Sequence, residues 1–401
     1  MKIRIYSPCF PHPITEGMHQ IVADQMNTFL SMGFETELVV VLETLEDIEN
    51  KASRELAELE ARGLRLTSLA HPSRRRIAVL EKARRGFRVA RSLVSQLASP
   101  EMHFYPPGLA RARSSDEADL AIYHYSFAYS WLKAGPSRGE KKRVAYLHNL
   151  ESELFELRAS VARGAAERAV HRLNAAKLRA HERELARYCD EVWFLSPVDR
   201  KALLPWAHNK LMRLTPPTYD ESLRQRRQKM AAIKGPQVRE MRAGIIGGLD
   251  FLPNYHSAKW LLEEVAPRLA ERGFTGKLVI AGKGAPEDLK ALGARYSFVE
   301  FTGFVRDLEE YWSQLSLSLV PHVSGSGVRM KLLESVASGV PVLANSDAIR
   351  RLHPEVQKSP FVVKCERTEE WVQCLLEEKP FETRQALSGV PHNPGLTGAK
   401  I

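Results

Sequence analysis

Two hydrophobic patterns alternate along this chain. Short runs that are apolar throughout or at every second position predict buried strands, and longer segments with apolar residues every three or four positions predict amphipathic helices. Strands that alternate with helices are typical of a parallel sheet with helices on both faces. Over residues 1–215 the predicted strands cover 2–7, 36–42, 64–69, 120–126, 143–149, 191–195 and 210–214, and the predicted helical regions cover 19–32, 45–62 and 151–187.

This pattern is interrupted once. Residues 216–240 are polar, basic and poor in strand formers, so we interpret them as an interdomain linker. The chain is therefore expected to be of class α/β, with Rossmann-like domains over 1–215 and 241–375. The Gly/Pro-containing tail at 376–401 either packs back on the first domain or is mobile. In the second domain the predicted strands cover 243–247, 277–281, 298–302, 315–320 and 340–344, and the predicted helices cover 257–271, 285–292, 308–314 and 328–338.

The segment 315–345 joins a strand, a glycine-containing loop and a helix. The loop Ser324–Gly327 lies just before the helix, where backbone N–H groups and the positive end of the helix dipole attract phosphate. Arg329 and Lys331 add two cations in the first helical turn, where positive charge is otherwise unfavourable. This combination indicates an anionic ligand.

The composition limits the classes of partner and site. A formal charge of +10 favours anions, which can be nucleic acid, an acidic membrane surface or phosphorylated small molecules. The 4 cysteines lie far apart without CxxC or Cys/His spacing, which argues against a zinc site or a disulfide framework. No apolar run approaches the roughly 20 residues that span a bilayer. We expect a cytoplasmic protein, either soluble or peripheral on the inner face of the membrane.

Residues 73–97 form a candidate basic amphipathic helix, in which arginines and lysines oppose Glu81 alone. It can be a core helix with a solvated basic face, or it can contact an anionic membrane surface. Nucleic-acid binding is disfavoured, because no aromatic platform accompanies the charge.

Polar residues at two predicted strand ends of the first domain are candidate ligand contacts. His148 lies at the end of the strand 143–149, and Glu16 and Gly17 lie where the chain passes from the first strand to a helix. Open α/β sheets bind ligands at the carboxyl ends of their strands. His148 can also be a hydrogen-bonded structural histidine, and we favour the functional interpretation.

An ordered series of segments resembles the retaining GT-B glycosyltransferases of family 4. The donor-domain segments are Gly247-Gly248 with Pro253-Asn254, LVIAGKG at 278–284, FTGFVRDLEEYW at 301–312 and SGSGVRMKLLESVASGVPVLAN at 324–345. Two first-domain segments are similar to the same family, YLHNLESE at 146–153 and ARYCDEVWFLSPVDRKAL at 186–203. The resemblance implies a GT-B architecture, in which two Rossmann-like β/α/β domains face each other across a cleft.

The resemblance also implies a site for a nucleoside diphosphate sugar. Glu334 would bind the ribose, Gly282 and Lys283 would flank the base, and the cations would neutralise the departing diphosphate. The implied catalytic residues are His148, which would contact the donor sugar, Arg329 and Lys331. The implied acceptor-side loop contains Glu16 and Gly17. The implied donor-binding residues are Gly248, Asn254, Gly282, Lys283, Gly325, Ser326, Gly327, Val328 and Glu334.

Three features depart from the family pattern. Ser326 occupies the position at which many members carry the first of two glutamates. Gly17 is the one glycine in a loop that often has two. The arginine and lysine often found after the first donor-domain strand are not evident around 247–255, where Asn254 or Lys259 is the candidate substitute.

The expected reaction moves a sugar from a nucleoside diphosphate donor to a hydroxyl of a glycan or lipid-linked acceptor, with retention at the anomeric carbon. Cell-envelope polysaccharide or glycolipid synthesis is the expected context. The chain has no DxD triplet, so we expect no divalent metal and no other cofactor. Two alternatives are a nucleotide-sugar epimerase of GT-B fold and a non-catalytic nucleotide-sugar-binding subunit, which Ser326 makes conceivable.

Overall fold

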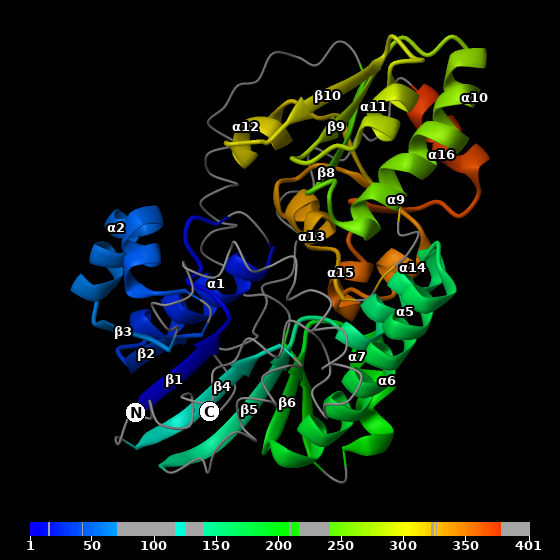
Figure 1. Cartoon of the computed structure of the whole chain (residues 1–401). Coiled ribbons are helices and arrows are strands. Elements are labelled where there is room, and N and C mark those ends of the chain that lie inside the picture. Colours follow the sequence, from blue (N-terminus) through cyan, green and yellow to red (C-terminus); the bar gives the residue numbers. More distant parts are fainter. Residues whose placement is uncertain are drawn as a thin grey trace, which may run out of the picture. The chain divides into compact units, whose positions relative to one another are not determined.

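The computed structural model describes residues 1–14, 17–41, 43–69, 117–125, 139–207, 210–215, 241–321, 325 and 327–377 (Figure 1). The predicted basic helix at 73–97, the linker at 216–240, most of the tail at 376–401, Glu16 and Ser326 lie outside these ranges. The chain divides into two compact units, Met1–Thr218 and Tyr219–Ile401.

The first unit contains a seven-stranded parallel sheet with the order β3-β2-β1-β4-β5-β6-β7. Its strands are β1 Lys2–Ser7, β2 Glu35–Val40, β3 Leu64–Ser68, β4 Ala118–His124, β5 Glu140–Leu147, β6 Glu191–Phe194 and β7 Leu211–Leu214. Its described helices are α1 Gly17–Ser31, α2 Leu45–Ala61, α5 Glu151–Val161, α6 Ala165–Tyr188, α7 Pro197–Leu203 and the short 3-10 turn Leu204–Trp206.

The second unit contains a six-stranded parallel sheet with the order β10-β9-β8-β11-β12-β13. Its strands are β8 Arg242–Ile246, β9 Lys277–Ala281, β10 Val299–Gly303, β11 Leu317–Val320, β12 Val342–Ala344 and β13 Val362–Lys364. Its described helices are α9 Leu252–Trp260, which continues through a π-helical segment Leu261–Val265 into α10 Ala266–Glu271, then α11 Glu287–Gly293, α12 Leu308–Ser313, α13 Met330–Ala337, α14 Ser346–Ile349, α15 Pro354–Gln357 and α16 Thr368–Leu376.

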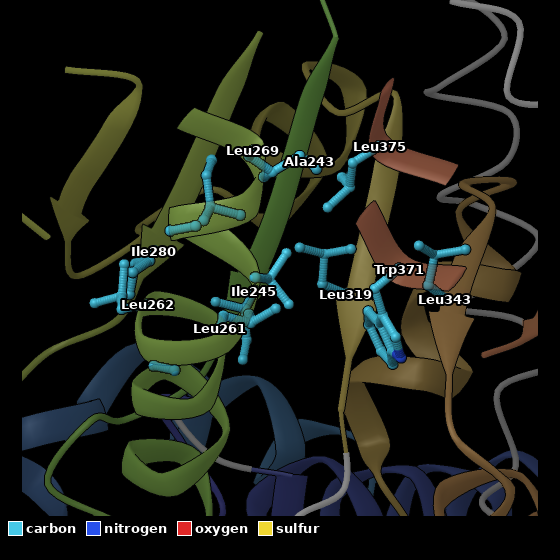
Figure 2. Close-up of a cluster of buried hydrophobic side chains, with 14 of the residues drawn as sticks. Ala243, Ile245, Leu261, Leu262, Leu269, Ile280, Leu319, Leu343, Trp371 and Leu375 are labelled. Carbon is cyan, nitrogen blue, oxygen red and sulfur yellow. The ribbon is translucent and has the colours of Figure 1, made fainter. Parts of the chain in front are cut away.

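Apolar side chains from strands and helices form the core of the second unit. Figure 2 shows Ile245, Ile280, Leu319 and Leu343 of four strands packed with residues from the helices, among them Trp371 of α16. All these side chains are essentially inaccessible to solvent. Because helices cover a parallel sheet on both faces, its inner strands β9, β11 and β12 are mostly apolar and buried, as the runs in the sequence indicated, whereas the edge strand β10 is partly exposed.

Several predicted helix boundaries differ from the structure by one or more residues, and three of these differences change how the helices are described. The helical region predicted at 151–187 is two helices, which are separated at residues 162–164. The helix predicted at 257–271 begins earlier, at Leu252, because proline is well tolerated in a first helical turn and Pro253 therefore does not delay it. The helix predicted at 328–338 begins at Met330, so Arg329 is its N-cap residue and precedes the first turn.

The strand order reverses beside the first strand of each sheet. β1 lies between β2 and β4, and β8 lies between β9 and β11. At such a position the loops that follow the two central strands lead away in opposite directions, and open α/β sheets bind their ligands there. We therefore expect ligand-binding residues in the loops after β1, β4, β8 and β11.

Candidate functional site

The loops after β8 and β9 lie side by side because two glycines permit their close approach. A Cβ atom on Gly282 would lie 1.8 Å from the carbonyl oxygen of Gly247, and its φ of +139° is one that other residues rarely adopt. Backbone bonding continues past the strands, from Gly247 N–H to the Ala281 carbonyl at 3.0 Å and from Leu249 N–H to the Lys283 carbonyl at 2.8 Å. Gly248, Gly282 and Lys283 are thus brought together.

Asn254 links this pair of loops to helix α13. Its side-chain amide donates to the Gly248 carbonyl at 3.0 Å, and its Oδ1 accepts from Nζ of Lys331 at 2.9 Å. Lys259 does not take part in this arrangement, since its ammonium pairs with Glu263 on the same helix at 3.6 Å. Asn254 and Lys259 were the two candidates to replace the missing cation after β8. Of these, Asn254 lies at the site, where it binds Lys331 of α13.

Arg329 lies at the same edge of the sheet. A Cβ atom on Gly325 would lie 3.1 Å from Nη2 of Arg329 and 3.1 Å from Cγ of Pro253. The arginine is buried, with 9% of its surface exposed. Gly325, Arg329 and Lys331 therefore lie close to the Asn254 segment, and Gly327 and Val328 connect the loop to the helix.

Helix α13 orients its charged residues through its apolar face. Leu332, Leu333 and Val336 are buried in a cluster with residues of β11 and β12. This packing fixes the rotation of the helix, so half-buried Lys331 and Glu334 lie to the side of that face. Burial, and then the nearby charge of Arg329, lower the pKa of Lys331 to about 7, while Glu334 opposes the shift. An anion that bound here would relieve this repulsion.

The candidate residues of the first unit centre on His148. It follows β5, and its Nε2 lies 2.8 Å from Nδ1 of His124, the last residue of β4. Nε2 of His124 in turn lies 2.9 Å from Oε1 of Gln25 in α1. All three residues are buried, and burial lowers the pKa of His148 to about 3 and that of His124 well below its ordinary value.

Sequence reasoning missed two residues of these arrangements, His124 and Gln25. His124 could have been found, because it lies near the end of the predicted strand 120–126, beside the strand that leads to His148, and neighbouring parallel strands carry their ends to the same edge of a sheet. Gln25 lies on the buried side of α1 and gives no signal in the sequence. Gly17 is the first residue of α1, and the predicted roles of Glu16 and Ser326 concern residues outside the described ranges.

The second unit matches a known family. Residues 241–377 match the family model described as glycosyl transferases group 1. This unit belongs to the glycosyl transferases group 1 family. The match spans β8, α13 and every candidate donor-binding residue. A comparison with curated proteins gave no match.

Solved glycosyltransferase structures resemble the chain over both units. Sucrose-phosphate synthase from Thermosynechococcus elongatus is 15% identical, with a TM-score of 0.56, over 94% of this chain and 90% of that chain. Anabaena HepE in complex with UDP-glucose is 13% identical, with a TM-score of 0.52, over 94% and 88%. WaaG, a glycosyltransferase involved in lipopolysaccharide biosynthesis, is 12% identical, with a TM-score of 0.57, over 94% and 90%. The fold is therefore GT-B, with two Rossmann-like units.

The part of the chain that the structure describes holds no candidate metal site or membrane span. These residues contain no group of three or more histidines, cysteines, aspartates or glutamates that could hold a metal ion. None of the described helices is long and apolar enough to cross a membrane.

Proposed function

We propose that this glycosyltransferase moves a sugar from a nucleoside diphosphate donor to a hydroxyl of a glycan or lipid-linked acceptor, with retention and without a divalent metal. One observation carries the proposal: Lys331, held by Asn254, and buried Arg329 supply two cations to the edge of the sheet in a unit of the glycosyl transferases group 1 family.

These cations would stabilise the leaving diphosphate. As the sugar–phosphate bond breaks, negative charge grows on the diphosphate, and cations already in place lower the energy of that state. Glu334, about one turn further along α13, is proposed to accept hydrogen bonds from the ribose hydroxyls. Gly282 and Lys283 are proposed to flank the base, and Gly248, Gly325, Ser326, Gly327 and Val328 to approach the diphosphate.

Retention follows if the acceptor attacks from the face that the diphosphate leaves. The leaving phosphate oxygen then takes the proton of the acceptor hydroxyl, so this scheme needs no carboxylate nucleophile. His148 is proposed to contact a hydroxyl of the donor sugar, and the loop with Glu16 and Gly17 to lie on the acceptor side. WaaG, which shares the fold, is involved in lipopolysaccharide biosynthesis, and this supports a role in cell-envelope polysaccharide or glycolipid synthesis at the cytoplasmic face of the membrane.

A thermal-shift panel with UDP, GDP, ADP and their sugars tests the donor site, because a ligand that prefers the folded state raises its apparent stability. UDP is the first candidate, since UDP-glucose occupies HepE. Transfer is then measured with Lys331→Met, with Glu334→Gln and with Lys290→Met as control, whose lysine pairs with Glu287 on the surface of α11. The control should behave like the wild type, and both site variants should lose transfer.

Four outcomes contradict parts of the proposal. Unchanged transfer in both site variants would exclude the assigned residues. Loss of activity on addition of EDTA would exclude the metal-independent scheme. Free isomerised sugar nucleotide without an acceptor would identify an epimerase, and nucleotide binding without transfer or hydrolysis would identify a non-catalytic subunit.

A further inference from the structure

His148 is fixed by a chain of hydrogen bonds that begins on another helix. The amide oxygen of Gln25 can only accept, so Nε2 of His124, 2.9 Å away, must carry the proton that it donates. A neutral imidazole has one N–H, so Nδ1 of His124 is an acceptor. It lies 2.8 Å from Nε2 of His148, which must therefore donate.

Both rings are neutral in this environment. His124 is completely buried and His148 is 7% exposed, and desolvation disfavours the charged form of each. With its proton on Nε2, neutral His148 keeps a lone pair on Nδ1. Among the described residues, Nδ1 of His148 has no hydrogen-bond partner.

Two tyrosines fix the plane of the His148 ring. The ring of Tyr125 lies 4.5 Å from it and that of Tyr146 lies 5.3 Å from it, measured between centroids. Tyr146 is itself held by a 2.9 Å bond from its hydroxyl to the Thr215 carbonyl. The φ of Tyr125 is +78°, a left-handed value that costs about 1–2 kcal/mol in a residue other than glycine. The fold tolerates this strain at the residue that packs against His148.

We infer that Gln25 and His124 are positioning residues that hold His148 in the Nε2–H tautomer, so that its Nδ1 accepts a hydrogen bond from a substrate hydroxyl. The substrate part of this inference rests on the proposed function; the tautomer part does not. The atom of the Gln25 amide that faces His124 decides which group donates in each of these hydrogen bonds. A reversed amide would reverse every donor and leave His148 to donate from Nδ1.

Nitrogen NMR of protein labelled with ¹⁵N-histidine tests the tautomer at pH 7 without any ligand. Two-bond ¹H–¹⁵N correlations distinguish a protonated ring nitrogen from an unprotonated one, and His124→Asn and His148→Asn assign the signals. The inference requires protonated Nε2 and unprotonated Nδ1 in both rings. A protonated Nδ1 in His148 would overturn it, whatever donor the enzyme uses.

Two substitutions of Gln25 test the positioning role. Gln25→Met removes the acceptor, so His148 should populate both tautomers and kcat should fall about 10- to 100-fold, by analogy with the loss of hydrogen-bond partners that orient metal-ligating histidines. Gln25→Glu keeps an acceptor and should restore the Nε2–H signal and most of the rate. Gln20→Met is the matched control, because it removes another buried amide of α1, one that donates to Asp24. It should change neither the His148 tautomer nor kcat.

The two proposals fail in different ways. If Gln25→Met lowers Tm as much as Gln20→Met does and leaves the His148 tautomer and kcat unchanged, Gln25 is merely structural and the inference is wrong. If the wild-type protein transfers no sugar while its spectra show the required tautomers, the proposed function fails and the tautomer assignment stands.

Discussion

At the scale of single residues, Lys331 is a lysine whose charge depends on what binds beside it. Its pKa of about 7 in the free protein must rise when an anion approaches, so nucleotide binding takes up a proton. As the pH rises above 7, a growing fraction of the free protein lacks this proton, and binding must first restore it in those molecules. The affinity for UDP should therefore fall as pH rises from 7 to 9, by at most about tenfold per pH unit.

Titration calorimetry in buffers of different ionisation enthalpy measures this proton uptake directly. Lys331→Met should bind UDP more weakly, with an affinity that no longer changes over that pH interval. A wild-type affinity that is independent of pH between 7 and 9 would contradict this account of Lys331.

A buried ion pair in the first sheet gives a prediction about stability. Nε of Arg4 lies 2.7 Å from Oε2 of Glu37, and both side chains are almost completely buried. Arg4→Met leaves the Glu37 carboxylate buried with Thr67 as its remaining hydrogen-bond partner in the described residues. Removing one member of a buried pair costs about 3–5 kcal/mol, so the urea midpoint should drop markedly.

The exposed pair of Arg54 and Glu58 in α2 provides the control. Arg54→Met should leave the urea midpoint almost unchanged, because exposed pairs contribute little. If the urea midpoint fell equally in Arg4→Met and Arg54→Met, burial would not be the reason that the Arg4–Glu37 pair stabilises the fold.

At the scale of elements, the contact between the β8 and β9 loops depends on Gly282. Gly282→Ala would place a Cβ atom 1.8 Å from a backbone oxygen, so the loops must separate. We expect a loss of about 4 kcal/mol or more in stability and loss of nucleotide binding. Gly303→Ala is the control, since its φ is also positive, at +68°, but its Cβ atom would meet nothing within 4 Å, and it should cost about 1–2 kcal/mol.

Thermal unfolding and UDP binding of the two variants check this prediction. If Gly282→Ala retained the binding of the wild type, the close approach of the two loops would not be needed for the site.

How far the sequence predicts the elements depends on how local their signals are. The strands Lys2–Ser7 and Lys277–Ala281 have the predicted bounds, because both lie inside their sheets and carry apolar, buried residues on their inner positions. The break between α5 and α6 was missed, since the residues at 162–164 contain only one weak helix breaker, Gly164. Local patterns thus give the order of strands and helices better than their ends.

The candidate site shows the same limit. The residue types that attract an anion are visible in the sequence, since Arg329 and Lys331 lie beside a glycine loop. The bond from Lys331 to Asn254 is not, because these residues are 77 positions apart and meet through the pairing of β8 with β11. The same holds for Gln25 and His124, which are 99 positions apart.

At the scale of the whole molecule, each unit has a hydrophobic core of its own. The core of the second unit contains Leu319 and Trp371, and Ile5 is completely buried in the first sheet. We therefore expect two unfolding transitions in calorimetry. A nucleotide at 100 times its Kd should stabilise the second unit alone by about 2.7 kcal/mol.

Two core substitutions assign the transitions. Leu319→Ala should lower the temperature of the transition that UDP shifts upward, and Ile5→Ala should lower the temperature of the other transition. Each substitution should reduce the free energy of unfolding of its own unit by about 2–5 kcal/mol. A single unfolding transition whose temperature falls in both variants would show that the units unfold together.

The hydrogen bonds that continue past the ends of β8 and β9 affect how binding proceeds in time. Gly247, Leu249 and Gly282 already donate their N–H groups to neighbouring backbone, so their amide protons should exchange slowly although they lie in loops. Fixing a mobile backbone residue costs about 1–2 kcal/mol. A nucleotide that arrives at these loops finds the chain already ordered, so its arrival rate should be set by diffusion and charge rather than by a loop that must first close.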